Sequence, residues 1–163
     1  MRGKEVAMLR LQIRFAEKSD LSQARQILRK FFTGSYLYWS DLLLGRLDTL
    51  VAVVNRRVVG VAELYTRDTE SHGRIGVIGF IAVDPEYRGR GIGKRLVGEA
   101  ERISRERGCS YSAASTRHDN TVSIRMFTGM GYKLYRWGEK EFDELEGPLY
   151  AYEDDVILVK KLV

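Results

Sequence analysis

The sequence predicts an α/β fold, in which helices are layered on a β-sheet within one domain. Two kinds of segment are mixed along the whole chain. In one, apolar and polar residues alternate, which is typical of strands, and in the other, apolar residues recur at helical spacing. The length of 163 residues suits one domain, and 44% hydrophobic residues suffice for its core. The sequence has only two prolines and no low-complexity tract, which argues against disorder.

The first half of the chain predicts the order strand, helix, helix, strand, strand. Alternation marks the strands, apolar residues three or four apart mark the helices, and Asn55 with two arginines marks the turn of a hairpin. Gly60 inside the second hairpin strand predicts a bulge or a close backbone approach. The expected elements are strand 9–16, a helix over 21–31, a short helix over 36–46, and strands 49–55 and 58–66.

The second half adds four strands and two helices. Gly108 is a natural helix stop, and Asn120 can cap the helix that follows it. An acidic, aromatic connection, residues 138–154, separates the last two strands. The expected elements are strand 74–84, a helix over 92–107, strand 110–116, a helix over 121–130, and strands 132–137 and 155–163.

Charge is spread unevenly along the chain. Residues 1–137 carry 24 Lys/Arg against 14 Asp/Glu, whereas residues 138–163 carry 3 against 8. The net charge of the whole chain is +5. A basic body attracts phosphates, either of nucleic acid or of a cofactor. No apolar run approaches the roughly 20 residues of a membrane span or resembles a secretory signal. The single Cys109 allows no internal disulfide, so we expect a soluble, cytoplasmic protein that does not bind membranes.

The segment VDPEYRGRGIGKRL, residues 83–96, predicts an anion site. Its glycines allow a sharp turn and a close backbone approach, and the helix that follows supplies unpaired N–H groups. Arg88, Arg90 and Lys94 add positive charge, so a diphosphate would fit. The P-loop pattern fails because Arg88 stands where it needs a glycine, and the dinucleotide pattern G-x-G-x-x-G fails from either starting glycine.

With these two loops excluded, the segment resembles the GNAT superfamily of N-acetyltransferases. Arg88, Gly91 and Gly93 match its signature Q/R-x-x-G-x-G/A after a strand, and Asn120 and Gly131 match its later segment N-x-x-A…Y-x-x-x-G-F. The opening LRLQIRFAEKSDLSQARQI and the hairpin NRRVVGVAEL are also similar, so the resemblance covers residues 9–163. Residues 1–8 are expected to be an N-terminal extension. An ordinary glycine-containing turn is the alternative for the loop taken alone.

The resemblance implies a mixed, mostly antiparallel sheet of six to seven strands that splays between strands 4 and 5, with about four helices. It implies acetyl-CoA as co-substrate and no metal. The pantetheine arm would lie along Ile81–Val83, and the Val83 N–H would stabilise the oxyanion of direct acetyl transfer. The cofactor-binding residues implied are Ile81, Ala82, Val83, Arg88, Gly89, Arg90, Gly91, Ile92, Gly93, Lys94, Asn120 and Phe127.

The catalytic base is open at the level of sequence. Ser115 and Phe127 stand where relatives that acetylate protein N-termini often have Glu and Tyr. Glu63 and His118 are substitute candidates, while the alternatives are a solvated strand carboxylate for Glu63 and a polar loop residue for His118.

Three function classes compete. The first is an N-acetyltransferase acting on a primary amine of a small molecule or protein, the acceptor being cationic in character. The second is an acyl-CoA-binding protein of the same fold without turnover, which the departures at Ser115 and Phe127 favour mildly. The third is a nucleic-acid module, which lacks any recognisable signature, so we expect no nucleic-acid partner. A homodimer is compatible with the sequence but not indicated by it.

Overall fold

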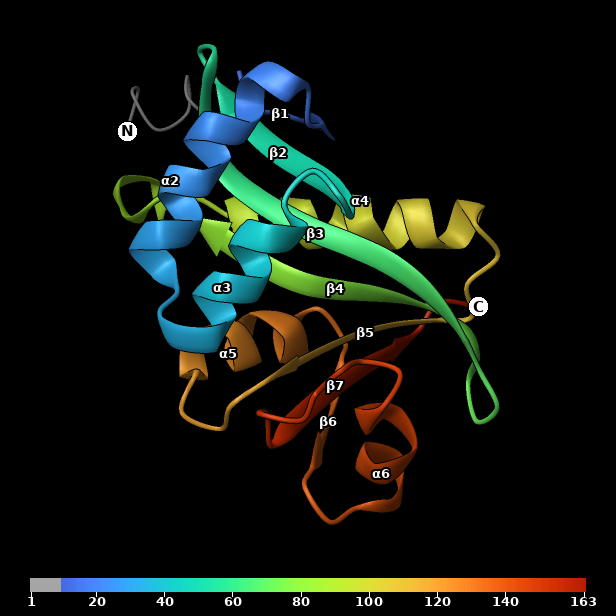
Figure 1. The fold of residues 1–163 in the computed structure, drawn as a ribbon. Coiled ribbons are helices and arrows are strands. Elements are labelled where there is room, and N and C mark those ends of the chain that lie inside the picture. The colour runs from blue at the N-terminus through green and yellow to red at the C-terminus, as the bar shows by residue number, and fades with distance from the viewer. Residues whose placement is uncertain (1–9) are drawn as a thin grey trace. The chain divides into compact units, whose positions relative to one another are not determined.

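The computed structural model describes residues 10–163, so the predicted extension 1–8 and the first predicted strand residue lie outside them. Seven strands form one mixed sheet in the order β1-β2-β3-β4-β5-β7-β6 (Figure 1). The strands are β1 (Gln12–Phe15), β2 (Asp48–Val54), β3 (Arg57–Thr69), β4 (Gly73–Val83), β5 (Tyr111–Thr116), β6 (Lys133–Arg136) and β7 (Val156–Lys161). The helices are α2 (Leu21–Phe31), α3 (Gly34–Leu43), α4 (Ile92–Glu106), α5 (Thr121–Gly129) and α6 (Lys140–Glu146), with short 3-10 turns η1 (Lys18–Asp20) and η2 (Pro85–Tyr87).

This topology confirms the predicted fold class. The pair β4–β5 is parallel, whereas β1–β2, β2–β3, β5–β7 and β6–β7 are antiparallel. The parallel ladder joins only Ile75–Val77 to Tyr111–Ala113, although both strands continue beyond it. None of the helices within residues 10–163 is long and apolar enough to span a membrane.

The described chain divides into two compact units that share β3, β4 and α4. Residues 10–64 and 80–99 form the first unit, and residues 65–79 and 100–163 form the second.

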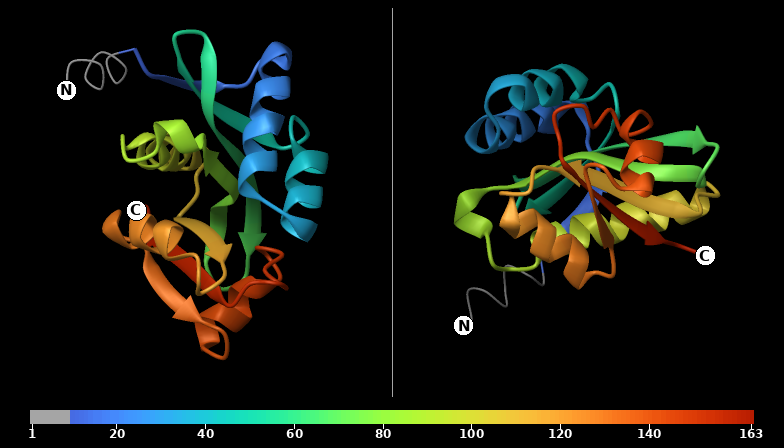
Figure 2. Two further views of the ribbon diagram at one scale, coloured as in Figure 1. Left: turned by 90° about the vertical axis from the view of Figure 1, so that its left-hand side faces the viewer. Right: turned by 90° about the horizontal axis from the view of Figure 1, so that it is seen from below.

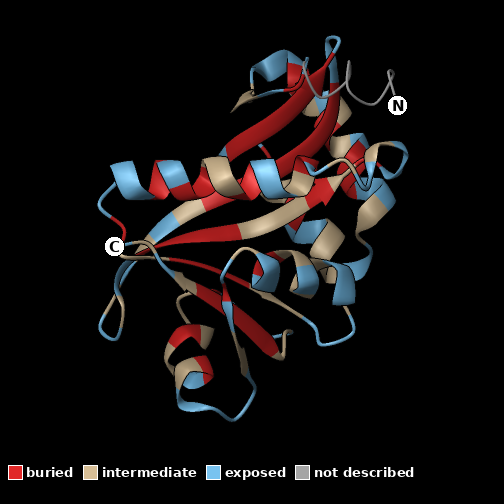
Figure 3. Cartoon of the chain, turned by 180° about the vertical axis from the view of Figure 1, so that it is seen from behind, coloured by how far each residue is buried: buried red, intermediate tan, exposed pale blue. Residues whose placement is uncertain are grey.

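In the first unit, helices cover both faces of the strands (Figure 2). Val51 and Val61 lie in a buried cluster with Ala24, Ile27 and Leu28 of α2. On the opposite face, a Cβ on Gly60 would meet the Leu96 side chain of α4 at 3.1 Å, so glycine allows a close approach here. The β2–β3 register also shifts between Ala52 and Val53, so both a bulge and a close approach occur, as predicted. Figure 3 shows β2 and β3 buried along most of the first unit.

In the second unit, α6 covers one sheet face, and its presence was not predicted. Phe142 and Leu145, three residues apart, are fully buried against Ile75, Ala113 and Ile157. From the sequence, this stretch was expected only to connect the last two strands. Glu141 and Asp143 lie in the first turn of α6, where negative charge suits the helix N-terminus.

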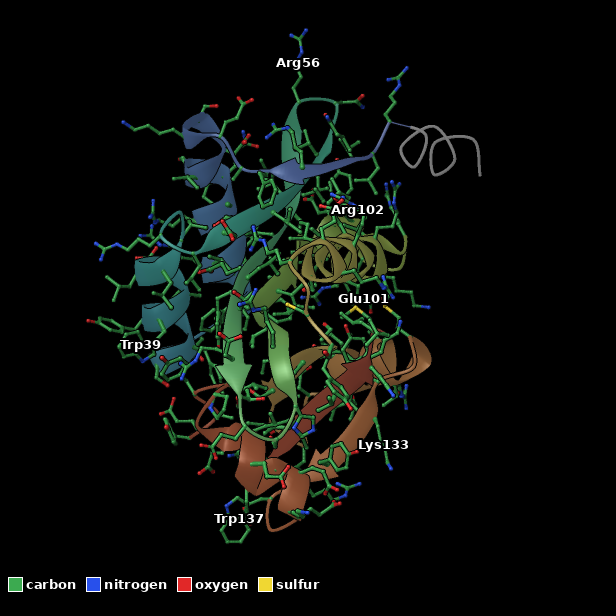
Figure 4. The ribbon with its side chains drawn as sticks, turned by 90° about the vertical axis from the view of Figure 1, so that its right-hand side faces the viewer. Trp39, Arg56, Glu101, Arg102, Lys133 and Trp137 are labelled. Carbon is green, nitrogen blue, oxygen red and sulfur yellow. The ribbon has the colours of Figure 1, made fainter. Side chains whose placement is uncertain are left out.

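The other face of this unit carries a buried polar network. The Tyr132 hydroxyl donates to Glu101 of α4 at 2.9 Å and shares a 2.7 Å hydrogen bond with Ser112. Lys160 donates to Glu101 at 3.0 Å, which neutralises that carboxylate. Figure 4 labels Glu101 on α4. Burial raises the pKa of Tyr132 well above its usual value. Cys109 is buried as a core residue, and burial raises the pKa of its thiol, which makes a nucleophilic role unfavourable.

Candidate functional site

The loop between β4 and α4 has the backbone geometry that the sequence predicted. Gly89 has φ +75° and Gly91 has φ +78°, in the left-handed region that favours glycine. An added Cβ at either position would meet no atom within 4 Å, so both glycines border open space. Arg95 donates from its N–H to Gly91 O at 3.1 Å, which starts the hydrogen-bond ladder of α4. The N–H groups of the preceding turn therefore have no partner within the helix.

Asp84 anchors the beginning of this loop. Its carboxylate accepts from Glu86 N–H at 3.0 Å and from Arg57 at 3.2 Å, and its own N–H donates to Val59 O at 2.8 Å. Although Asp84 is only 3% exposed, its charge is therefore compensated. The capping role of Asp84 was not predicted, although an Asp before a proline turn is a recognisable capping signal.

The loop cations are held by aromatic rings instead of by carboxylates. The guanidinium of Arg88 lies 5.4 Å from the centroid of the Phe31 ring, and that of Arg90 lies 4.9 Å from the Tyr87 ring. Arg57 of β3 also lies over Tyr87 at 5.5 Å, but its charge is paired with Asp84. The cation–π contacts of Arg88 and Arg90 orient the guanidinium groups but leave their positive charge uncompensated. Together with the exposed Lys94, they give this loop the charge of an anion site.

The end of β4 presents an edge next to this loop. The Asp84 N–H points toward β3, and N–H groups alternate between the two edges of a strand. Those of Ile81 and Val83 therefore point away from β3, while the buried Ala82 packs against α2. Ile81 and Val83 are half-buried, so this edge of β4 can accept an extended partner.

Glu63 is a buried carboxyl on β3 of the same unit. It is 0% exposed, and neither of its oxygens has a hydrogen-bond partner within the described part of the chain. Burial, with a further contribution from the negative charge of Asp41, raises the pKa of Glu63 to about 8. The alternative of a solvated strand carboxylate is therefore wrong, because a helix layer covers this face.

His118 lies in the second unit and forms a dyad with Asp155. Its Nδ1 lies 2.5 Å from Asp155 Oδ2, and its backbone N–H donates to Asp155 Oδ1 at 2.7 Å. Burial opposes ionisation of Asp155, but the hydrogen bonds from His118 prevail and lower the pKa of that carboxyl. Because the His118 side chain is 60% exposed, its Nε2 edge is open to solvent. The sequence predicted His118 but not Asp155, which stands 37 residues away.

Asn120 and Phe127 are also in the second unit. Asn120 caps α5 by accepting from Ser123 N–H at 3.4 Å, and its amide donates to Thr116 Oγ1 at 3.0 Å. Phe127 is 3% exposed and packs edge-on against Tyr132, with ring centroids 5.0 Å apart. Ser115, which stands where relatives often carry Glu, donates to Asp154 at 2.7 Å.

Comparison with known proteins decides the family. The sequence pattern of the Acetyltransferase (GNAT) family matches residues 11–132, about three quarters of the chain. The chain belongs to this family. Within residues 10–163, no group of three His, Cys, Asp or Glu side chains is arranged to hold a metal ion.

Two curated GNAT relatives carry amine acetylation in their names. The chain is 39% identical over 80 residues to L-2,4-diaminobutyric acid acetyltransferase of Streptomyces coelicolor, covering 47% of each chain. It thus spans about half the length of that relative. It is 31% identical over 110 residues to glucosamine 6-phosphate N-acetyltransferase of Trypanosoma brucei brucei, covering 61% of this chain and 75% of the relative.

Solved GNAT structures share the fold at lower identity. The NatC complex bound to Gag peptide and CoA contains a chain with a TM-score of 0.70 and 19% identity, covering 94% of this chain and 99% of that one. At this identity, the likeness establishes the fold alone.

Proposed function

We propose that this GNAT protein is an acetyl-CoA-dependent N-acetyltransferase that transfers an acetyl group directly to a primary amine of a small molecule or protein. The observation that carries the proposal is the loop of residues 88–94. There, two left-handed glycines border open space, a helix N-terminus offers N–H groups, and three cations lack carboxylate partners among residues 10–163. The names of the curated relatives, which act on amines, support the reaction class.

The residues of the loop fit a CoA diphosphate. A Cβ at position 89 or 91 would fill part of the cradle, and the first-turn N–H groups of α4 are donors for phosphate oxygens. Arg88, Arg90 and Lys94 would add charge-assisted contacts. The edge at Ile81 and Val83 would pair with the pantetheine amides, with the Val83 N–H donating to the carbonyl oxygen where charge develops. Acetyl-CoA supplies an activated thioester. Asn120 and Phe127 keep their predicted cofactor roles as part of this proposal.

His118 is one candidate for receiving the proton of the acceptor. Asp155 accepts a hydrogen bond from Nδ1–H and so fixes the tautomer in which Nε2 is free to accept a proton. This is the orientation that a histidine base needs, with a carboxylate holding its other nitrogen.

The prediction of one domain spanning residues 9–163 is retained. The family match over residues 11–132 passes through both compact units, which supports treating them as parts of one functional domain. Cys109 is a free, buried thiol, which suits the reducing cytoplasm predicted from the sequence.

The test is an acetyl-transfer screen that measures release of the CoA thiol across primary amines. We expect turnover with at least one amine, together with a rise in melting temperature on addition of CoA. CoA binding without turnover on any amine would favour the acyl-CoA-binding alternative. No CoA binding at all would remove the proposed function.

A further inference from the structure

Glu63 is an energetic anomaly in the first unit. Among residues 10–163, its two oxygens are the buried side-chain polar atoms that lack a hydrogen-bond partner. Leaving a buried polar group unpaired lowers stability, and more so when the group is charged. A folded chain tolerates such a cost when the group serves a ligand or a reaction.

The position of Glu63 in the sheet defines what covers it. Glu63 pairs with Thr49 across β2–β3, two residues from the pair Val51–Val61 that packs against α2. Because side chains alternate along a strand, Glu63 points to the same face, under the α2–α3 layer. The Thr49 hydroxyl is occupied, since it donates to Leu47 O at 3.1 Å and accepts from Gly45 N–H at 3.2 Å.

Aromatic rings of α2, α3 and β4 gather on this face, since Phe80 alternates in register with Ala82, which packs against α2. Phe80, on the neighbouring strand β4, lies edge-on to Phe32 at 5.6 Å, and Phe32 stacks with Tyr36 at 6.3 Å. Phe31 contacts Phe32 at 4.9 Å and carries the guanidinium of Arg88 over its ring. A continuous row of rings therefore leads from the loop proposed to bind CoA to the face that holds Glu63.

The charged groups of the covering layer largely compensate each other. Asp41 of α3 acts on Glu63, but its carboxylate is paired with Arg25 of α2 at 2.6 Å. On β4, residues 75–83 are all apolar or glycine, so they add no charge. The ionised Glu63 would therefore favour a ligand that brings a cation and repel one that brings an anion.

Helix α3 is the thinnest part of this cover. Of its ten residues, only Ser40 is buried, and Tyr38 and Trp39 are 62% and 49% exposed (Figure 4). The helix begins at Gly34, where φ is +58°, and its capping residue Thr33 makes no side-chain cap. A segment with so little buried surface opens at low free-energy cost.

We propose that Glu63, together with Phe32, Tyr36 and Phe80, forms the acceptor site, which α3 uncovers and which selects a primary amine carried on an apolar group. This deepens the proposed function and rests on it. The Glu63 carboxylate takes one proton from the ammonium, which gives a neutral amine and a carboxylic acid. The amine nitrogen then bonds to the acetyl carbon, the carbon–sulfur bond breaks with its electron pair on sulfur, and the nitrogen releases its surplus proton to water.

The proposed acceptor site discriminates between amines by the group that carries the amine. An ammonium on an aryl or alkyl chain places its charge on Glu63 and its carrier among the rings. A sugar phosphate or an amino-acid carboxylate would bring a second negative charge near Glu63 and Asp41. We therefore expect 2-phenylethylamine to be acetylated with a kcat/KM at least tenfold above those of glucosamine 6-phosphate and 2,4-diaminobutyrate.

Two measurements on the full chain test the site. Glu63→Gln should lower kcat for 2-phenylethylamine by about a hundredfold, the typical contribution of a positioned base, and remove the rise of rate with pH near 8, while the CoA-induced shift in melting temperature persists. The matched control Glu70→Gln, in the exposed β3–β4 turn, should leave all three unchanged. In wild-type protein, 2-phenylethylammonium alone should move the 13C carboxyl resonance of Glu63.

These measurements distinguish failure of the acceptor site from failure of the proposed acetyltransferase function. Equal turnover by wild type and Glu63→Gln, or a preference for the anionic amines, would overturn the acceptor site while acetyl transfer stands. If no amine is acetylated, the carboxyl resonance still decides, since an unmoved Glu63 signal would refute the amine site. This resonance is read in wild-type protein, so it also decides if Glu63→Gln does not fold.

Discussion

Glu63→Gln should change how stability depends on pH. The native chain keeps the Glu63 proton until about pH 8, whereas the ordinary pKa is 4.5. Between these values, the unfolded chain has released a proton that the native chain retains, so raising the pH favours unfolding. The contribution is fully present below pH 4.5 and is lost as pH rises through about 8. Linkage over this interval gives a loss of about 3 kcal/mol between pH 5 and pH 8.

Urea titrations of wild type and Glu63→Gln at pH 5, 6, 7 and 8 measure this loss. For an m-value of about 2 kcal/mol/M, the wild-type midpoint should fall by about 1.5 M relative to the variant. The two chains share every other titrating group, so their difference isolates Glu63, and Glu70→Gln should parallel wild type. A difference between midpoints that stays constant from pH 5 to pH 8 would refute the raised pKa.

Three further predictions concern the loop, the polar network and the α5 cap. Gly91→Val should abolish the CoA-induced rise in melting temperature, because the side chain fills space that the diphosphate needs and strains the backbone at φ +78°. Gly98→Ala on α4, where the backbone is not left-handed, should keep the rise. Tyr132→Phe should lower the free energy of unfolding by about 1–3 kcal/mol because Glu101 and Ser112 lose a partner. A stability loss no larger than that of Tyr135→Phe in urea would contradict this network. Asn120→Ala should cost about 1 kcal/mol, and Asn120→Asp clearly less, in the same assay, since Asp keeps the capping oxygen.

Local chemistry made the geometry of the loop between β4 and α4 predictable. Glycine favours the left-handed conformations seen at Gly89 and Gly91, and the change of apolar spacing at Ile92 marks where the helix begins. The close approach at Gly60 was also predictable, because a glycine inside an apolar strand indicates that another element approaches the backbone.

Features that depend on distant pairing could not be predicted. His118 and Asp155 meet because both flank the β5–β7 ladder, and nothing near His118 in the sequence indicates its partner. Alternation along β3 places Glu63 on one face, but whether that face is wet or covered depends on α3, which has no clear amphipathic pattern of its own. Helix α6 was missed because only Phe142 and Leu145 mark its buried side within an acidic stretch.

The interleaving of the two units has a consequence for biogenesis. The chain passes between them three times, after residues 64, 79 and 99, so no single cut releases either one intact. During synthesis, the last residue of the first unit emerges well before β7, which pairs with both β5 and β6 in the second. The ribosome thus holds a nascent chain whose N-terminal unit can already pack, while the exposed strand β5 waits for its antiparallel neighbour. Translation speed across residues 117–155 would set how long that unpaired strand is available for aggregation.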